Sequence, residues 1–535
     1  MALAAPATAP AVLTREQRRV VFASSLGTVF EWYDFYLYAT LAPFFASLFF
    51  PKGNDTAALL SAFATYAAGF LVRPFGALVF GRIGDLVGRK YTFLVTIIVM
   101  GAATAAVGLL PTYARIGIAA PILLTLLRLL QGLALGGEYG GAATYVAEHS
   151  RHGRRGWSTS WIQTTATVGF FLSLVVIGGV RANMDEAAFH DWGWRLPFLV
   201  SLFLLAFSVY IRMKLEESPV FRRMKAEGKG SKAPLTESFA NWRNAKIVLL
   251  ALFGATAGQG VVWYTGQFWA LFFLTITLKA NYVTAYVLVA VALVIATPFF
   301  VFFGGLSDRI GRKKIILAGC LLAALTYYPL FRALTRAVNP ALADYAARTP
   351  VSVASGPCPM HIFVLPGTKY ADCERAKDFL VKAGLSHRSL PPEEGRSVVT
   401  RIGDRTLAGF DEAGYKAALA ATGYPSVFDR TALNWPLAIA ILFVLVLYVT
   451  MVYGPIAAFL VELFPTRIRY TSMSLPYHIG NGWFGGMLPL LATAIMASTG
   501  NIYAGLRYPV AVALLTVVVG ALFLPETRDV DIDRF

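Results

Sequence analysis

The sequence predicts an all-α membrane protein built from two six-helix bundles, with a small α/β-like insert in the second bundle. Of its 535 residues, 57% are hydrophobic and only 14% are charged, whereas a soluble protein carries about 25% charged residues. Apolar runs close to the ~20 residues that cross a bilayer recur along the chain. A polar turn of ten residues also occurs twice, once in each half. Together these observations predict a duplicated membrane bundle.

The repeated turn occupies 81–90 and 304–313, each time between two apolar runs. The residues Gly81, Asp85, Gly88, Arg89 and Lys90 return as Gly304, Asp308, Gly311, Arg312 and Lys313. Paired bundles with equivalent turns are typical of secondary transporters.

Twelve spans are expected, six on each side of a basic linker. They are 20–48, 57–80, 91–111, 118–142, 158–180, 194–212, 246–275, 282–303, 314–333, 433–458, 470–497 and 504–524. The chain then divides into a cytoplasmic tail (1–18), an N-terminal bundle (19–212), a cytoplasmic linker (213–245), spans seven to nine (246–333), a periplasmic insert (334–432), spans ten to twelve (433–524) and a cytoplasmic C-terminus (525–535).

Basic residues orient these spans. They gather in the tail, in the repeated turns and in the linker, which are therefore expected inside the cell. The short loops on the other side hold isolated ones, namely Lys52, Arg115, Arg181, Arg195, Lys279 and Arg507. The net charge of +17 thus reflects membrane topology, and no nucleic-acid partner is expected. Residues 1–14 lack the charged start and cleavage site of a signal peptide and are expected to form a tail.

The insert is polar and too long to lack structure of its own. We expect short strands at 351–353, 361–365 and 397–402, and helices at 373–383 and 412–421. The strand at 397–402 is followed by a turn at 403–404.

Two of the three cysteines, Cys358 and Cys373, lie in the insert. On the oxidising side of a membrane we expect a disulfide between them, worth roughly 3 kcal/mol for a loop of this length. The alternative is two free thiols in a loop. With His361 they lack an evident fourth ligand, so no metal site is expected.

Charged residues inside the N-terminal spans mark a candidate site, because a charge at the bilayer centre costs at least ~2.5 kcal/mol. Carboxylates there can take up protons, and arginines can hold an anionic group with two hydrogen bonds. The alternative is that Arg73 pairs with a carboxylate of the first span only to fix helix packing. The candidates are Glu31, Asp34, Arg73, Arg128, Gln131 and Glu138.

The second half supplies amide and aromatic groups that are expected to line the opposite wall of a central cavity. The candidates are Gln259, Tyr264, His478 and Asn481.

The repeated turns are expected to control conformation. Asp85 and Asp308 are placed to cap a helix N-terminus or to pair with a basic residue across the bundle interface. Such contacts would hold the cytoplasmic side closed, whereas the alternative is ordinary loop chemistry. The gating candidates are Gly81, Asp85, Gly88, Arg89, Lys90, Asp308, Gly311 and Arg312.

Several motifs resemble the major facilitator superfamily. The two turns resemble its signature between spans two and three and between spans eight and nine. The runs 128–132 and 525–528 are similar to its span-four motif, whose arginine is associated with proton coupling, and to the motif after its last span. Within it, 30–35 and 131–139 resemble the metabolite:proton symporter family, whose members carry α-ketoglutarate, citrate, shikimate, or proline and glycine betaine.

The resemblance implies proton-driven uptake of a small organic acid or zwitterion by alternating access across the inner membrane. The expected protein is monomeric, needs no cofactor besides the coupling proton, and places both termini in the cytoplasm. No proline lies between Trp157 and Arg195, where drug antiporters of the superfamily carry a Gly-Pro motif, which argues against export. A drug or metabolite exporter is the first alternative, and a sensor using the insert is the second. No phosphate-binding loop, zinc motif or nucleophile elbow indicates an enzyme.

Overall fold

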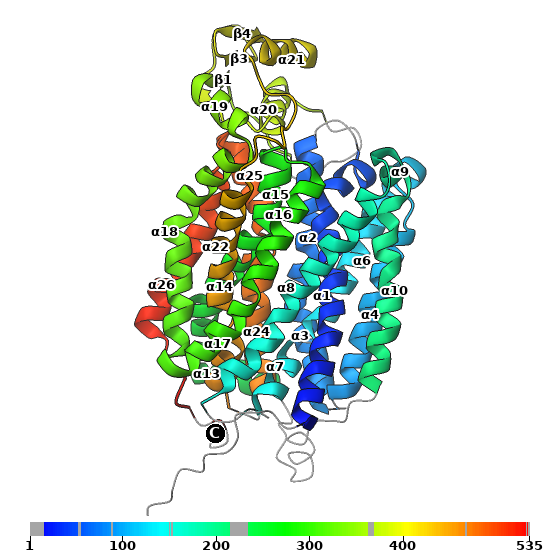
Figure 1. The fold of residues 1–535 in the computed structure, drawn as a ribbon, viewed down its shortest axis with the longest axis vertical. Coiled ribbons are helices and arrows are strands. Elements are labelled where there is room, and N and C mark those ends of the chain that lie inside the picture. Colours follow the sequence, from blue (N-terminus) through cyan, green and yellow to red (C-terminus); the bar gives the residue numbers. More distant parts are fainter. Residues whose placement is uncertain are drawn as a thin grey trace, which may run out of the picture.

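The computed structural model is a mostly helical bundle with a small domain at one end (Figure 1). It describes the chain except residues 1–14, 52–54, 87–88, 138, 149, 151–152, 214–233, 362–368, 466–467, 531 and 533–535. Ten stretches of the described chain are long and apolar enough to cross a membrane. They are Ala57–Phe80, Ala119–Gly136, Arg155–Ala182, Gly193–Tyr210, Trp242–Thr277, Tyr282–Ile310, Arg312–Val338, Trp435–Leu463, Arg469–Thr499 and Ala504–Phe523.

The first half contains one long helix before these stretches and one between them, at the expected first and third spans. These are α1 (Arg15–Phe49) and α4 (Arg89–Leu109). The other helices of this half are α2 (Asp55–Leu71), α3 (Arg73–Leu86), α5 (Tyr113–Ile116), α6 (Ala119–Gly136), α7 (Tyr139–Glu148), α8 (Arg155–Ala182), α9 (Glu186–Asp191), η1 (Gly193–Arg195) and α10 (Leu196–Met213).

The second half, after the linker, is also a bundle of helices. Its helices are α12 (Pro234–Phe239), α13 (Trp242–Ala251), η2 (Leu252–Thr256), α14 (Ala257–Tyr264), η3 (Thr265–Trp269), α15 (Ala270–Phe272), η4 (Phe273–Thr277), α16 (Tyr282–Ala296), α17 (Pro298–Ile310), α18 (Arg312–Val338), α22 (Trp435–Tyr453), α23 (Ile456–Leu463), α24 (Arg469–Ile479), η5 (Gly480–Gly485), α25 (Leu488–Thr499), η6 (Ala504–Leu506) and α26 (Arg507–Phe523).

The regular α-helical geometry of the spans is interrupted in two ways. α2 ends at Leu71 and α3 begins at Arg73, beside Pro74, which has no N–H to continue the hydrogen-bond ladder. The stretch Trp242–Thr277 contains three π-helical turns, η2, η3 and η4, and Arg469–Thr499 contains another, η5. Such turns are concentrated at functional sites.

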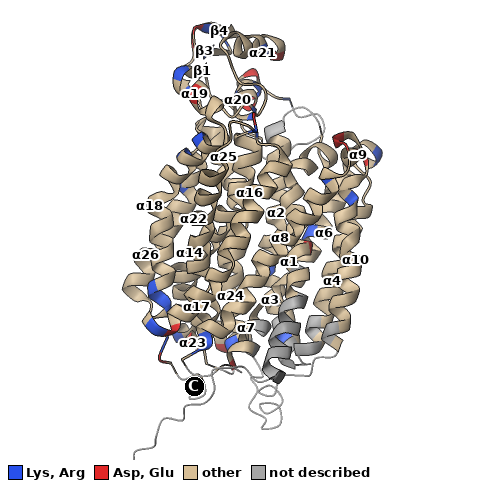
Figure 2. Ribbon diagram, in the orientation of Figure 1, with Lys and Arg blue, Asp and Glu red and all other residues tan. Residues whose placement is uncertain are grey.

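The charges are distributed as a bilayer requires. Lysine, arginine, aspartate and glutamate gather at the two ends of the bundle, and few lie along its middle (Figure 2). Large apolar side chains remain exposed on the outer faces, for example Phe203 on α10, Leu325 on α18 and Leu522 on α26. Apolar side chains on the outer faces of a bundle are suited to contact with lipid.

The insert folds around its own core. Its helices are α19 (Pro340–Arg348), α20 (Asp372–Lys382) and α21 (Glu412–Ala421), and its strands are β1 (Val351–Ser355), β2 (Arg388–Leu390), β3 (Val398–Ile402) and β4 (Arg405–Ala408). The strand order is β2-β1-β3-β4, with β1 parallel to β2 and antiparallel to β3, and β3 antiparallel to β4. Buried residues from both sheet and helices form the core, including Val353, Leu380, Val398 and Tyr415.

The structure confirms most of the expected insert elements and corrects others. The two helices and the strands at 351–353 and 397–402 are present, and Gly403 has the positive φ (60°) that a tight turn between β3 and β4 needs. Most of the strand expected at 361–365 lies outside the described residues. The helix α19 was not predicted. The strands β2 and β4 were missed because they are short and only partly buried. The insert also begins later than 334, because α18 continues to Val338.

Candidate functional site

The centre of the N-terminal half contains two buried arginines that flank one aromatic ring. The guanidinium carbon of Arg73 lies 4.3 Å from the centre of the Phe35 ring, and that of Arg128 lies 4.7 Å from it. Both side chains are shielded from solvent. Arg73 also lies 4.1 Å over Phe70, and Arg128 lies 4.5 Å over Tyr38. Aromatic faces stabilise a guanidinium but do not use its N–H donors.

Close helix packing sets the positions of these arginines. A Cβ at Gly132 on α6 would collide with the carbonyl of Gly69 on α2, and a Cβ at Gly136 would collide with the carbonyl of Arg73. Small residues at such spacing let membrane helices approach backbone to backbone. The glycines of α6 therefore bring Arg128 and Arg73 to the same ring.

Arg128 is partly satisfied within its own span. Its Nη1 donates to Gln131 Oε1 (2.6 Å), and Gln131 Nε2 donates to Thr104 Oγ1 on α4 (2.8 Å). Nε and Nη2 of Arg128, and Nε and Nη2 of Arg73, are buried with no hydrogen-bond partner in the described chain. Buried charged donors in this state are stabilised by a hydrogen-bond acceptor, and an anionic group suits them best.

The first span contributes Asp34, which is buried and whose Oδ1 has no hydrogen bond to any described residue. The alternative of a purely structural ion pair with Arg73 is wrong for Asp34, because the described residues contain no such pair and Arg73 contacts aromatic rings instead. Glu31, the other partner in that alternative, and the candidate Glu138 lie outside the residues whose side chains the structure describes.

Two of the amide candidates of the second half contact each other. Gln259 on α14 and Asn481 in η5 form a reciprocal pair, with both N–H···O distances 2.9 Å. A Cβ at Gly260 would collide with the carbonyl of Gly480, so the two spans touch at this level. His478 is buried, and neither ring nitrogen has a hydrogen-bond partner among the described residues.

An aromatic layer joins the halves between these two polar groups. Trp263 lies 6.5 Å from Trp32 and 5.6 Å from Tyr36, ring centre to ring centre, and Phe70 lies 5.4 Å from Tyr264. Trp32 and Tyr36 on α1 are one helical turn apart and were not predicted as cavity residues. Their spacing on the same face as Phe35 was the available signal.

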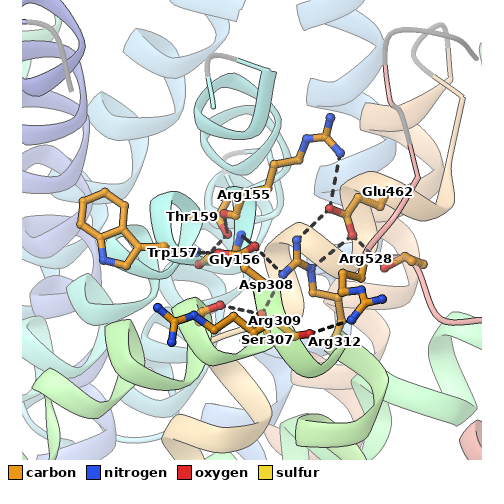
Figure 3. Close-up of polar contacts among 12 residues, drawn as sticks. Arg155, Gly156, Trp157, Thr159, Ser307, Asp308, Arg309, Arg312, Glu462 and Arg528 are labelled. Carbon is orange, nitrogen blue, oxygen red and sulfur yellow. Dashed lines mark hydrogen bonds and ion pairs between the residues drawn. The ribbon is translucent and has the colours of Figure 1, made fainter. Parts of the chain in front are cut away.

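A second polar cluster lies at the end of the bundle opposite the insert (Figure 3). Asp308, near the end of α17, accepts hydrogen bonds from the backbone N–H groups of Gly156 and Trp157 through its two oxygens, both at 2.9 Å. These residues form the first turn of α8, which belongs to the other half. The carboxylate thus caps a helix across the bundle interface, as expected from the repeated turn.

Arg312 connects this cap to the rest of the second half. Its Nη1 donates to Asp308 Oδ1 (2.6 Å), while Nη2 and Nε donate to the two oxygens of Glu462 (3.1 and 3.3 Å). Arg155 of α8 lies 3.5 Å from the same carboxylate. A second ion pair across the interface joins Arg469 to Glu148 (3.1 Å).

The chain after α26 completes the cluster. Glu526 accepts hydrogen bonds from the backbone N–H groups of Arg312 (2.7 Å) and Lys313 (3.2 Å), so it caps α18. Gly311 has φ 111°, and a Cβ there would collide with the Glu526 carboxylate. Sequence reasoning predicted the residues of the turn but missed Arg155, Glu462 and Glu526. A buried arginine that needs a carboxylate from another span was the signal.

The first copy of the turn cannot be compared. Gly81, Asp85, Gly88, Arg89 and Lys90 lie outside the residues whose side chains the structure describes. The gating contacts expected for the first copy stay predictions.

The insert carries the expected disulfide between Cys358 and Cys373, whose Cα atoms are 6.0 Å apart. It links the loop after β1 to the first turn of α20. Beside it, His361 Nδ1 contacts Glu374 Oε1 at 2.7 Å. The third cysteine, Cys320, is buried in α18.

The chain matches the model of the "Sugar (and other) transporter" family over residues 20–246 and 396–535. It is 36% identical over 327 residues to the alpha-ketoglutarate permease of Escherichia coli K12, covering 61% of this chain and 74% of that protein. It is 32% identical over 521 residues to the "Putative metabolite transport protein" of Haemophilus influenzae, covering 96% of this chain and 95% of that protein.

A further relative and a solved structure are also similar to this chain. The proline/betaine transporter of Salmonella typhimurium is 35% identical over 325 residues, covering 59% of this chain and 64% of that protein. The solved proton:xylose symporter of the major facilitator superfamily has the same fold, with a TM-score of 0.62 at 14% identity, covering 97% of this chain and 98% of that chain. The protein is therefore a multi-pass membrane transporter that belongs to the sugar (and other) transporter family and has the fold of a major facilitator superfamily symporter.

Proposed function

We propose that this transporter couples the uptake of a small carboxylate-bearing metabolite to proton influx across the inner membrane. The substrate class comprises small organic acids and zwitterions such as proline. The observation that carries the proposal is the pair of buried guanidinium groups of Arg73 and Arg128 around Phe35, with donors that no described residue uses. A substrate carboxylate would accept hydrogen bonds from these donors.

The coupling site in this proposal is Asp34, which precedes Phe35, the ring that both arginines contact, in α1. Its buried carboxylate has an oxygen without a hydrogen bond to the described chain. A proton on Asp34 neutralises a charge that the membrane interior disfavours, and its release on the other side returns the carrier. Glu31, one helical turn earlier in the sequence, would share this role.

Alternating access would follow from the cluster of Asp308, Arg312 and Glu462. Because it joins the halves at the end away from the insert, the structure corresponds to a state closed at that end. The positive-inside distribution of basic residues supports placing this end in the cytoplasm, both termini with it, and the insert in the periplasm. Twelve spans, including α1 and α4, would give this topology.

The test is uptake into proteoliposomes that contain the purified protein. The panel is α-ketoglutarate, citrate, shikimate, proline and glycine betaine, each labelled, with and without an inward proton gradient. Accumulation of a carboxylate compound that collapses with a protonophore is the expected result. Gradient-driven loss of the compound from loaded vesicles would instead establish an exporter and overturn the proposal.

A further inference from the structure

The disulfide of the insert lies at the start of a helix that connects two parallel strands. β1 and β2 are neighbouring parallel strands, and α20 lies between them in the chain. Cys358 is in the loop after β1, and its partner Cys373 is in the first turn of α20. β3 and β4 extend the sheet on the other side of β1. Cysteines at the N-terminus of the helix of a βαβ unit are typical of thioredoxin-like redox centres.

The two sulfur atoms differ in their access to solvent. Cys373 is 7% exposed and belongs to the core of the insert, whereas Cys358 is half-buried at the edge of this core. Because an incoming thiolate must reach the sulfur that it attacks, Cys358 is the accessible target and Cys373 the leaving group. The residue before α20 is Ala371, whose side chain cannot cap the helix. The N–H groups of the first turn therefore remain to stabilise a thiolate on Cys373.

A histidine and a carboxylate lie beside the accessible sulfur. Cys358, His361 and Glu374 line one cavity of about 120 Å³. His361 Nδ1 contacts Glu374 Oε1 at 2.7 Å, so Nε2 is the ring atom that can exchange a proton with a third group. A thiol must lose its proton before it attacks a disulfide, and an imidazole oriented by a carboxylate is a suitable base.

The same cavity suits a polar occupant with a short apolar body. Glu374 is 8% exposed, and its Oε2 has no hydrogen-bond partner in the described chain. A buried carboxylate oxygen in this state is stabilised by a donor such as a hydroxyl or thiol group. Leu60 of α2 and Met360 supply apolar surface, and Lys377 is the cationic residue of the described lining.

The insert can open its disulfide and stay folded in place. It has a core of its own, drawn from its sheet and helices. The contacts that hold it on the bundle lie beyond the other end of α20. A Cβ at Gly384 would collide with the carbonyl of Thr277, and the N–H of His387 donates to the carbonyl of Gly500 (2.8 Å). Reduction of the disulfide therefore removes neither the core nor the docking contacts.

We propose that the Cys358–Cys373 disulfide is a centre of thiol–disulfide exchange with a dithiol, which gives the transporter an attached oxidoreductase domain. His361 takes the proton of one thiol, and the resulting thiolate attacks Cys358 Sγ. A mixed disulfide forms, the bond to Cys373 breaks, and its electron pair stays on Cys373 Sγ. The second thiolate of the dithiol then displaces Cys358. The dithiol loses two electrons and becomes a disulfide, and its two protons end on the two cysteines.

The test measures reduction of this disulfide in the purified full chain that carries Cys320→Ala, so that the Cys358–Cys373 pair supplies all the thiols. The probe is dithiothreitol, and the thiols formed are counted by alkylation and mass spectrometry. The rate is expected to rise in proportion to the dithiothreitol concentration. His361→Gln and Glu374→Gln should each slow it about tenfold or more, because the base or its orienting group is lost. His190→Gln on α9 and Glu412→Gln on α21 are exposed controls that should leave the rate unchanged.

A disulfide with a structural role alone would respond in the opposite direction. Loosening the contacts around it would expose the sulfur atoms, so His361→Gln and Glu374→Gln would speed reduction. A rate that does not depend on the dithiothreitol concentration would likewise show that unfolding of the insert limits the reaction. Either result overturns the proposal.

Single-cysteine variants test which sulfur is attacked. Cys373→Ser leaves Cys358, which should form a mixed disulfide with oxidised glutathione. Cys358→Ser leaves the buried Cys373, which should react at least about tenfold more slowly. Equal rates overturn the assignment. The exchange reaction is independent of the proposed transport, since exchange without uptake of any compound supports the centre while contradicting the proposed function, and normal uptake without exchange does the reverse.

Discussion

Arg312 and Glu462 form a two-point ion pair in which neither side chain is accessible to solvent. Arg312 begins α18 and Glu462 lies in the last turn of α23, so the pair links two spans that are far apart in the sequence. Through Asp308 the same guanidinium is connected to the first turn of α8 in the other half. This end of the transporter is therefore closed by a buried charge network (Figure 3).

Glu462→Gln should strongly destabilise the protein. It removes the buried carboxylate that faces both Arg312 and Arg155 and leaves Asp308 as the remaining ion-pair partner of Arg312. Removing one partner of a buried ion pair costs about 3–5 kcal/mol. The melting temperature in detergent and uptake activity should both fall. Glu412→Gln breaks an exposed pair with Lys416 and should change stability by less than about 1 kcal/mol. Equal effects of the two substitutions would contradict a central role for Glu462.

Asp308→Asn should shift the transporter toward the state that is open at this end. The amide keeps one acceptor oxygen for the first turn of α8 but loses the charge, a change worth about 1 kcal/mol. The probe is Ser160→Cys in a Cys320→Ala background, because Ser160 of α8 is buried against Gly304 of α17. Alkylation should become several-fold faster, while Lys416→Cys on α21 reports constant reactivity. An unchanged rate at position 160 would show that the cap does not hold the halves together.

Asp34→Asn should uncouple transport from the proton gradient. The amide resembles the protonated carboxyl and cannot cycle, so accumulation driven by the gradient is lost. Exchange of labelled for unlabelled substrate at equal pH needs no net proton movement and should continue. Full accumulation by this variant would remove Asp34 from the coupling role.

Arg128→Lys tests the bidentate contact to the substrate. Lysine keeps the charge but loses the planar fork and the hydrogen bond to Gln131, so the affinity for a carboxylate substrate should fall by about tenfold to a hundredfold. The measurement is KM for uptake and Kd for binding in the same preparation. Unchanged KM and Kd would assign Arg128 to packing alone.

His387 should make the stability of the insert depend on pH. Burial, with a smaller effect from Lys377, lowers the pKa of His387 to about 4 from 6.5. The unfolded insert therefore binds the proton more readily, and stability falls as the pH drops from about 6.5 to about 4, by about 3 kcal/mol. Hydrogen-exchange protection of the insert amides measures this change. His387→Phe should remove most of the dependence, whereas His190→Phe, an exposed site on α9, should leave it in place.

Local patterns were sufficient to predict many elements. The apolar runs identified the spans that the structure contains, because a membrane demands about 20 apolar residues wherever a helix crosses it. The repeated turn located Asp308 and Arg312, and the spacing of Arg128 and Gln131 placed them on one helical face, where they are hydrogen bonded. Two of the three insert helices, α20 and α21, were predicted, but α19 was not. The strands β2 and β4 depend on pairing with neighbours and left little local signal.

What the sequence alone determined is the class of the protein, namely a duplicated helical membrane bundle with buried charges and a disulfide-bearing insert. Only the tertiary structure decided which residues meet. Arg73 and Arg128 share the Phe35 ring because glycines let α2 and α6 touch, and Glu462 reaches Arg312 although the two are distant in the chain. Cys358 and Ser498 line one cavity because Gly384 lets the insert dock. Such contacts arise from close packing between elements, which no local pattern of residue types records.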